Sequence, residues 1–279
     1  MQTKLIDGRA LALKIQEQLA DQVKNMSHKP VLAVILVGDN PASLTYVRNK
    51  TKKAESVGIE SRLFHLSPVM SEDALISFVR ELNVNKDIDG ILVQLPLPSH
   101  MNTDAVLESI DPKKDADGLH SVNLGKLFAG HPTLVPCTPM ACLELIKAVC
   151  PSTEGMHAVI VGRSRLVGKP LAQLLLDAQC TVTQAHSRTK NLKDITSQAD
   201  ILISATGKSG LITKDCVKSG AIVIDVGITK GVDGCLTGDV DRLSVEGTAG
   251  ALTPVPGGVG PMTITMLLKN VVSIAMAKM

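Results

Sequence analysis

The stretch His157-Ala-Val-Ile-Val161-Gly162-Arg-Ser-Arg-Leu-Val-Gly168-Lys-Pro170 decides the fold of the second half of the chain. Its first residues predict a short apolar strand, and residues 171–178 predict a helix. A glycine turn between a strand and a helix lets backbone N–H groups hold a phosphate. The turn departs from the plain G-x-G-x-x-G pattern, because Ser164 occupies the second glycine position and the last glycine comes one residue late. Alone, the motif is therefore a weak indication of a dinucleotide site.

The strand that follows the helix indicates which dinucleotide is bound. It is Cys180-Thr-Val-Thr-Gln-Ala185, and the next residues are His186-Ser187-Arg188. An NAD enzyme usually carries an acidic residue here for the ribose hydroxyls, and none is present. Arg188, with Arg163 in the turn, suits a 2′-phosphate because guanidinium–phosphate pairing is strong and geometrically specific. The pattern favours NADP over NAD, the alternative being two ordinary exposed arginines.

Two further apolar strands, at 200–204 and 221–226, continue the alternation of strand and helix. Each ends in small residues, which allow a flat ligand to approach the backbone closely. We therefore predict a Rossmann-type dinucleotide-binding domain over residues 139–261. The loop 253–261 follows, and the broadly apolar helix from Met262 to about Ala277 is expected to return to the first domain.

The first domain is predicted to comprise residues 1–138 together with 262–279. Seven apolar residues without alternation, Val31 to Val37, indicate a strand buried on both faces, as in a parallel sheet. Helices and strands alternate around it, so the fold class is α/β, with two α/β domains. Residues 119–139 are proline-rich and are interpreted as an irregular crossing between the domains. The other predicted elements are a helix carrying Leu11, Ile15, Leu19 and Val23, strands at 59–66 and 91–95, and helices from Ser71, near 102–110 and from Thr138 to about Val149.

A helix predicted over 41–57 carries the only tyrosine of the chain, Tyr46, and a lysine four residues later, Lys50. The two side chains share one helix face. Asp39-Asn40 and Pro41 provide a start signal, and Gly58 provides a stop. Spacing alone favours a surface pair over a functional one.

Two polar residues, Gln94 and Asp117, lie beside or within predicted loops of the first domain. Gln94 precedes two prolines that end a strand, and ligands of α/β sheets bind beyond such strand ends. It is either a functional amide or simply the polar end of the strand. Asp115, Asp117 and Gly118 suggest a metal loop, but the glycine is early and no glutamate stands at the twelfth position. We expect no metal, and interpret Asp117 as an aspartate that recognises a ligand.

The bulk composition excludes several classes of protein. The formal charge of +2 implies no strong field for nucleic acid or a membrane surface. Six cysteines without a C-x-x-C pair indicate reduced thiols rather than disulfides or a zinc site. No signal-peptide pattern opens the sequence, and the apolar runs are too short to span a bilayer. We expect a cytoplasmic protein.

Five motifs in order resemble the bifunctional methylenetetrahydrofolate dehydrogenase/methenyltetrahydrofolate cyclohydrolase family. They are Ser43-x-x-Tyr46-Val-x-x-Lys50, Val93-Gln-Leu-Pro-Leu-Pro98, Lys114-Asp-x-Asp117-Gly118, Val161-Gly-Arg-Ser164-x-x-Val167-Gly-x-Pro170 and Pro254-Val-Pro-Gly-Gly-Val-Gly-Pro-Met-Thr263. The resemblance covers essentially the whole chain. It implies oxidation of 5,10-methylenetetrahydrofolate with NADP⁺, hydrolysis of the methenyl product to 10-formyltetrahydrofolate, and a homodimer joined through the cofactor domain.

The resemblance also implies roles for particular residues. Lys50 would be the acid/base or polarising group of the hydrolysis, Gln94 would orient it, Tyr46 would hold the folate, and Asp117 would bind the pterin edge. The implied cofactor positions are Gly162, Arg163, Ser164, Ser187 and Ile228. We add Arg188, because no acidic residue follows the strand that ends at Ala185. The implied folate-binding residues further include Leu95, Pro96, Pro256, Gly257 and Gly258.

Three alternatives remain open at the level of the sequence. Another two-domain NADP-dependent dehydrogenase of a small polar substrate would explain the glycine turn, but not Lys50, Gln94 and Asp117 together. A dehydrogenase without the hydrolytic step is expected to lack Lys50, which is present. A non-catalytic nucleotide-binding protein would have no reason to keep a lysine, an amide and a carboxylate at three such positions.

Overall fold

The computed structural model describes residues 2–231 and 234–278, which form two compact units. The three-stranded unit comprises Lys14–Cys137 and Ile264–Met279, and the six-stranded unit comprises Met1–Leu13 and Thr138–Thr263. The predicted division placed residues 1–13 in the first domain. They belong instead to the six-stranded unit, because Lys4 and Ile6 donate backbone hydrogen bonds to Gly250 and Leu252.

The three-stranded unit has the parallel sheet order β3-β2-β4. Strand β2 is the central strand and is buried along its whole length, whereas β3 lies at an edge of the sheet. Segment 114–116 runs parallel to β4 through a bridge between Ile91 and Asp115. Its elements are β2 (Val31–Val37), α2 (Pro41–Ser56), β3 (Glu60–Leu66), α3 (Glu72–Val84), β4 (Gly90–Val93), α4 (Thr103–Glu108) and α5 (Ser121–Phe128).

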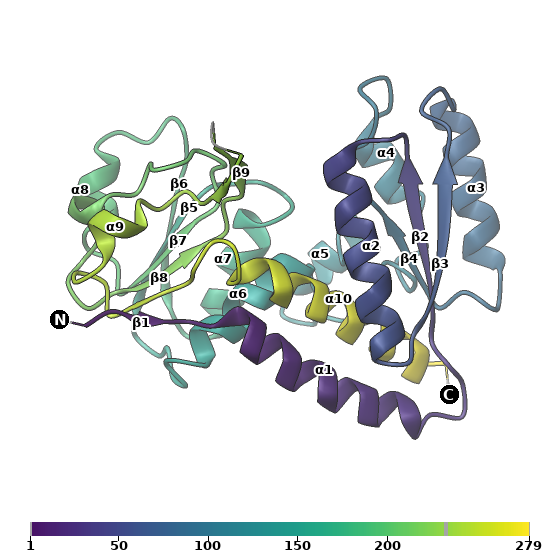
Figure 1. Ribbon diagram of the computed structural model, residues 1–279, viewed down its shortest axis with the longest axis horizontal. Helices are drawn as coiled ribbons and strands as arrows, with labels where there is room; N and C mark the ends of the chain where they lie inside the picture. The colour runs from purple at the N-terminus through teal and green to yellow at the C-terminus, as the bar shows by residue number, and fades with distance from the viewer. Residues whose placement is uncertain (1, 232–233, 279) are drawn as a thin grey trace. The chain divides into compact units, whose positions relative to one another are not determined.

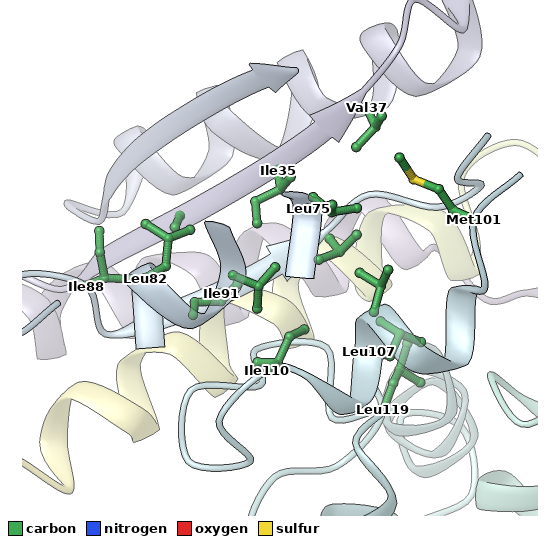
Figure 2. Packing of buried hydrophobic residues seen from close by; sticks show 14 of the residues in the cluster. Ile35, Val37, Leu75, Leu82, Ile88, Ile91, Met101, Leu107, Ile110 and Leu119 are labelled. Atoms are coloured by element: carbon green, nitrogen blue, oxygen red, sulfur yellow. The ribbon is translucent and has the colours of Figure 1, made fainter. Parts of the chain in front are cut away.

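Helices cover both faces of this sheet, with α2 and α3 on opposite sides (Figure 1). Alternate residues of β2, such as Ile35 and Val37, pack with Leu75 and Leu82 of α3 in one core cluster, which Figure 2 shows from close by. The strand therefore buries apolar side chains on both faces, as expected for the centre of a parallel sheet.

The six-stranded unit is a parallel sheet of order β1-β11-β8-β7-β5-β6. After β6 the chain returns past β5 to form β7, so the strand order reverses at β5. Its elements are β1 (Lys4–Leu5), α6 (Cys137–Lys147), β5 (His157–Val161), α7 (Gly168–Asp177), β6 (Thr181–Ala185), α8 (Leu192–Thr196), β7 (Ile201–Ser204), a 3₁₀ helix (Lys214–Cys216), β8 (Ile222–Asp225), the hairpin strands β9 (Thr229–Lys230) and β10 (Leu236–Thr237), α9 (Arg242–Val245) and β11 (Ala251–Leu252).

Two long helices belong partly to each unit: α1 (Gly8–Lys24) and α10 (Val259–Met276). Helix α10 packs against the three-stranded unit as predicted, where the bare backbone of Gly90 leaves room for Val271. By length and composition α10 would suffice to cross a membrane, contrary to the sequence expectation, but 67% of its apolar window is buried inside the protein. A core helix that is mostly buried inside a protein can have the same length and composition as a membrane-spanning helix.

The segment interpreted as irregular, 119–139, contains a helix. Helix α5 begins after His120, whose Nδ1 accepts a hydrogen bond from the Val122 N–H. The prolines that suggested irregularity all lie after it, at positions 132, 136 and 139. The prediction was therefore wrong for residues 121–128.

Candidate active site

Helix α2 presents Tyr46 and Lys50 on one face, as its spacing predicted. Asn40 caps it, with Oδ1 accepting hydrogen bonds from the Ala42 and Ser43 N–H groups at 3.0 and 3.1 Å. The Lys50 Nζ lies 4.7 Å from the centre of the Tyr46 ring, within the range of a cation–π contact. Lys50 is only 5% exposed, so the surface-pair interpretation of this helix is wrong.

The Lys50 amine has a partner at the end of strand β4. Its Nζ donates a hydrogen bond to Oε1 of Gln94 at 3.1 Å. Gln94 in turn donates from Nε2 to the carbonyl oxygen of Leu95 at 2.6 Å, and its backbone N–H is bonded to Ile35. The amide is therefore fixed at both ends, which fixes the direction in which its oxygen points. Leu95 and Pro96, joined by a cis peptide bond, follow directly.

Asp117 reaches the same end of the sheet through segment 114–116. The N–H of Ile91 donates to Lys114 and the N–H of Ala116 donates to Ile91, so the segment continues the sheet beside β4. Because the pairing is parallel, Asp117 follows the paired segment at the end where Gln94 follows β4. Asp117 is half-buried, and its charge acts on both Lys50 and Tyr46.

Burial controls the protonation of this cluster. It lowers the pKa of Lys50, against the opposing charge of Asp117. Burial also raises the pKa of Tyr46, with Asp117 adding to the effect, so the phenol stays protonated. A lysine whose pKa is lowered, beside a fixed amide oxygen, can more readily take up and release a proton than an exposed lysine can.

The predicted dinucleotide turn lies where the strand order of the six-stranded sheet reverses. Gly162 has a φ of +136°, and a Cβ on it would lie 2.5 Å from the Ala205 carbonyl oxygen. A Cβ on Gly168 would lie 2.2 Å from the Gly162 oxygen. Ser164 Oγ accepts a hydrogen bond from the Val167 N–H, which shapes the turn, and helix α7 carries no side-chain cap. The helix start is thus available to a ligand phosphate.

The other predicted cofactor residues follow neighbouring strands. Ser187 and Arg188 follow β6, whose last residue pairs with the last residue of β5, so both loops lie at one sheet edge. Arg163, Ser164, Ser187 and Arg188 are all exposed. Ile228 follows β8 and is 59% exposed, beyond Gly227.

Buried carboxylates hold the loop that carries Ile228. Asp225 Oδ1 accepts the N–H groups of Gly227 and Asp239. Burial raises the pKa of Asp225 to about 6. Asp239 accepts from Ser204 and Thr206, which ties the end of β7 to the same place. These contacts fix the strand ends next to the predicted cofactor positions.

The predicted folate loop, with Pro256, Gly257 and Gly258, begins after β11 and leads into α10. It packs against the start of α1, where a Cβ on Gly8 would lie 2.0 Å from the Gly258 oxygen. A pocket of about 330 Å³ on the same unit is lined by Asp225, Thr253 and Val255 among others, but by none of the predicted cofactor residues.

Sequence reasoning missed two residues close to Asp117. The thiol of Cys137 is buried within reach of the charges of Asp117 and Lys50, and Asn270 donates hydrogen bonds to the backbone around it. The signal in the sequence was an asparagine in a largely apolar helix. Among residues 2–231 and 234–278, no cluster of three His, Cys, Asp or Glu side chains could hold a metal ion.

The glycine turn at a strand-order reversal and the buried lysine–amide pair define a class of protein. It is an α/β enzyme with a dinucleotide-binding unit and a second unit that carries acid–base chemistry.

Comparison with known proteins identifies the family. Residues 6–117 match the catalytic domain of tetrahydrofolate dehydrogenase/cyclohydrolase, and residues 136–279 match its NAD(P)-binding domain. The bifunctional protein FolD of Streptococcus agalactiae is 52% identical over 272 residues, which is 96% of each chain. The chain belongs to the tetrahydrofolate dehydrogenase/cyclohydrolase family.

Solved structures of enzymes from this family are similar to this chain along its whole length. The bifunctional methylenetetrahydrofolate dehydrogenase/cyclohydrolase of Campylobacter jejuni is 46% identical with a TM-score of 0.97, covering 99% of this chain and 100% of that one. The Trypanosoma brucei enzyme, in complex with NADP and an inhibitor, is 38% identical with a TM-score of 0.94, covering 100% and 99%. The predictions of a two-domain α/β fold, of both folate activities and of NADP as cofactor are confirmed.

Proposed function

We propose that the three-stranded unit performs the hydrolysis of 5,10-methenyltetrahydrofolate with Lys50 as its acid–base group. The observation that carries the proposal is the buried amine, with its lowered pKa, held 3.1 Å from the Gln94 oxygen. A cationic substrate beside it would lower the pKa of the amine further, since like charges disfavour each other.

The chemistry requires one water and one mobile proton. The water oxygen bonds to the bridging carbon of the methenyl cation, and Lys50 accepts a proton from that water. The bond between the carbon and one ring nitrogen then breaks, and this nitrogen ends with a proton. One of the two water protons thus stays in 10-formyltetrahydrofolate and the other is released. General acid–base catalysis of this kind contributes about 10²–10⁴-fold.

Tyr46, Gln94 and Asp117 are proposed to bind and orient the folate. A carboxylate that accepts two N–H donors suits the 2-amino-4-oxo edge of the pterin, so Asp117 takes that role. Tyr46 offers a ring face and a protonated phenol, and Gln94 directs Lys50. Leu95 and Pro96, with Pro256, Gly257 and Gly258, complete the proposed folate-binding residues.

The dehydrogenase step is assigned to the proposed NADP site at Gly162, Arg163, Ser164, Ser187, Arg188 and Ile228. The tight glycine turn and uncapped start of α7 suit a pyrophosphate, and the exposed arginines suit a 2′-phosphate. When bound at these residues, NADP⁺ would supply the acceptor for the hydride of the folate methylene bridge. The residues of the chain hold and orient the two reactants. Such positioning alone contributes a large part of a rate enhancement.

We also propose that the protein is a homodimer and that it is located in the cytoplasm. It rests on the family resemblance, and light scattering on the purified protein tests the dimer directly: a mass of one chain would contradict it. The domain boundaries at about 138 and 262 are part of the same proposal.

A paired assay tests the proposed function. The protein is mixed with 5,10-methylenetetrahydrofolate and either NADP⁺ or NAD⁺, while absorbance follows both the reduced cofactor and the methenyl product. We expect reduction of NADP⁺ in preference to NAD⁺ and disappearance of added methenyltetrahydrofolate in a separate cuvette. If the protein oxidises methylenetetrahydrofolate but does not accelerate the hydrolysis of methenyltetrahydrofolate, it is a dehydrogenase without the second activity.

A further inference from the structure

Helix α10 contains one buried asparagine whose contacts lead to the folate side of the three-stranded unit. Asn270 is 5% exposed and lies on a helix most of whose residues are apolar and buried. Its Nδ2 donates to the carbonyl oxygens of Ala116 and Val135, both at 2.9 Å, and lies 3.6 Å from the sulfur of Cys137. One amide therefore ties two distant segments of the chain together.

The two segments that meet at Asn270 enclose Asp117. Ala116 immediately precedes the aspartate, and Gly118 immediately follows it. A Cβ on Gly118 would lie 2.5 Å from the carbonyl carbon of Val135, so the turn after Asp117 is pressed against residues 135–136. Cys137 closes the arrangement, because its thiol donates to the Ala116 oxygen at 3.5 Å. The backbone on both sides of Asp117 is thus held by Asn270 and Cys137.

Burial of α10 alone does not require these polar contacts. Apolar side chains would bury α10 equally well, whereas an amide in this position costs desolvation unless it is fully bonded. The Cys137 thiol is also unsuited to be a nucleophile, since burial raises its pKa well above the ordinary value of 9.0 and it stays protonated. Both groups are hydrogen-bond donors aimed at the carbonyls next to the aspartate.

We infer that Asn270, assisted by Cys137, is a positioning residue for Asp117, fixing the direction in which its carboxylate meets the pterin edge of the folate. The inference rests on the proposed role of Asp117. A carboxylate that must accept two N–H donors at once tolerates little rotation, because bidentate hydrogen bonds demand alignment of both partners. Asn270 supplies that alignment through the backbone on which Asp117 is carried.

The test uses Asn270→Ala with Thr265→Val as its matched control. Thr265 lies on the same helix and also takes part in a buried hydrogen bond, which it accepts from Gln16 Nε2 of helix α1 at 2.7 Å. We expect Asn270→Ala to raise KM for methylenetetrahydrofolate about tenfold, as loss of an aligned contact of about 1.4 kcal/mol would. KM for NADP⁺ should stay within about twofold in both variants, since cofactor contacts are untouched.

A double-mutant cycle asks whether Asn270 acts through Asp117. In an Asp117→Ala background, Asn270→Ala should raise the folate KM no further, because the group that it positions is gone. If the two effects multiply, or if Asn270→Ala raises both KM values equally, the inference is wrong. If Asp117→Ala alone leaves folate binding unchanged, the proposed role of Asp117 fails instead.

Variants of Cys137 keep the inference testable if Asn270→Ala does not fold. Cys137→Ser retains a donor to the Ala116 oxygen, and Cys137→Ala removes it. We expect the alanine variant to raise the folate KM and the serine variant to stay close to the parent enzyme. Equal folate KM values for the two variants would contradict the part assigned to the thiol.

Discussion

Replacement of a single lysine should separate the two activities. Lys50→Met keeps the length of the side chain but removes the amine that we propose accepts the proton of water. We expect the hydrolysis rate to fall by about 10²–10⁴-fold, while methylenetetrahydrofolate still binds. Lys53→Met, on an exposed position of the same helix, is the control and should leave hydrolysis unchanged. Stopped-flow absorbance of methenyltetrahydrofolate measures both, and full hydrolysis by Lys50→Met would disprove the assignment.

The environment of Lys50 predicts a pH dependence with a definite sign. Burial lowers its pKa, so the neutral amine becomes available below the ordinary value of 10.5, and hydrolysis should rise with pH through the lowered pKa. Gln94→Glu places a negative charge where Oε1 now lies, 3.1 Å from Nζ. This charge favours the ammonium form and raises the pKa. The rate profile should therefore move to higher pH, and a profile unmoved by the substitution would contradict a base role for Lys50.

Replacement of Arg163 should change the preference for NADP⁺ over NAD⁺. Arg163 is exposed in the turn after β5, and we propose that it contacts the 2′-phosphate of NADP. Arg163→Ala should raise KM for NADP⁺ by at least about tenfold and KM for NAD⁺ far less, because only NADP carries the extra phosphate. Initial rates with each cofactor provide the measurement. An equal effect on both KM values would count against contact with the phosphate.

At the level of elements, the turn between β5 and α7 leaves no room for a side chain at position 168. A Cβ at position 168 would lie 2.2 Å from the Gly162 oxygen, so Gly168→Ala must displace the turn. We expect a loss of about 1–3 kcal/mol in unfolding free energy and weaker NADP⁺ binding. Gly125→Ala, in α5 with no atom within 4 Å of the added methyl group, is the control. Urea unfolding and cofactor titration measure the two effects, and wild-type binding by Gly168→Ala would disprove this reasoning.

The elements show where sequence patterns suffice and where they do not. Strand β2 and helix α2 were predictable because their signals are local: an unbroken apolar run, an Asn40 cap and Pro41 at the first turn. Strands β1 and β11 were not, since each has two residues and is defined only by pairing with segments distant in the sequence: β1 pairs with β11, and β11 also pairs with β8. The burial of Lys50 was likewise hidden, because it depends on segments that include Gln94 and Cys137, far along the chain.

At the scale of the whole molecule, the end of the chain is tied back to the three-stranded sheet by a buried carboxylate. Asp89 is fully buried and accepts hydrogen bonds from Lys278 at 2.7 Å, from His28 at 2.8 Å and from the Val31 N–H at 2.8 Å. Burial alone would raise the pKa of Asp89, but these bonds outweigh it and hold the pKa below the ordinary 3.8. The contribution to stability is therefore present above pH 3.8 and lost as the pH falls through the lowered pKa.

Lys278→Met should consequently destabilise the protein in a pH-dependent way. Removal of one partner leaves a buried charge less well bonded, at a cost of about 1–3 kcal/mol near neutral pH. The folded-state pKa of Asp89 then rises, so the variant loses stability at a higher pH than the parent does during acid titration. Lys193→Met breaks an ion pair with Asp215 whose two side chains are both exposed, and should produce no measurable loss. Urea unfolding at several pH values distinguishes these outcomes, and equal stability curves for the two variants would show that the tie through Asp89 adds nothing to the fold.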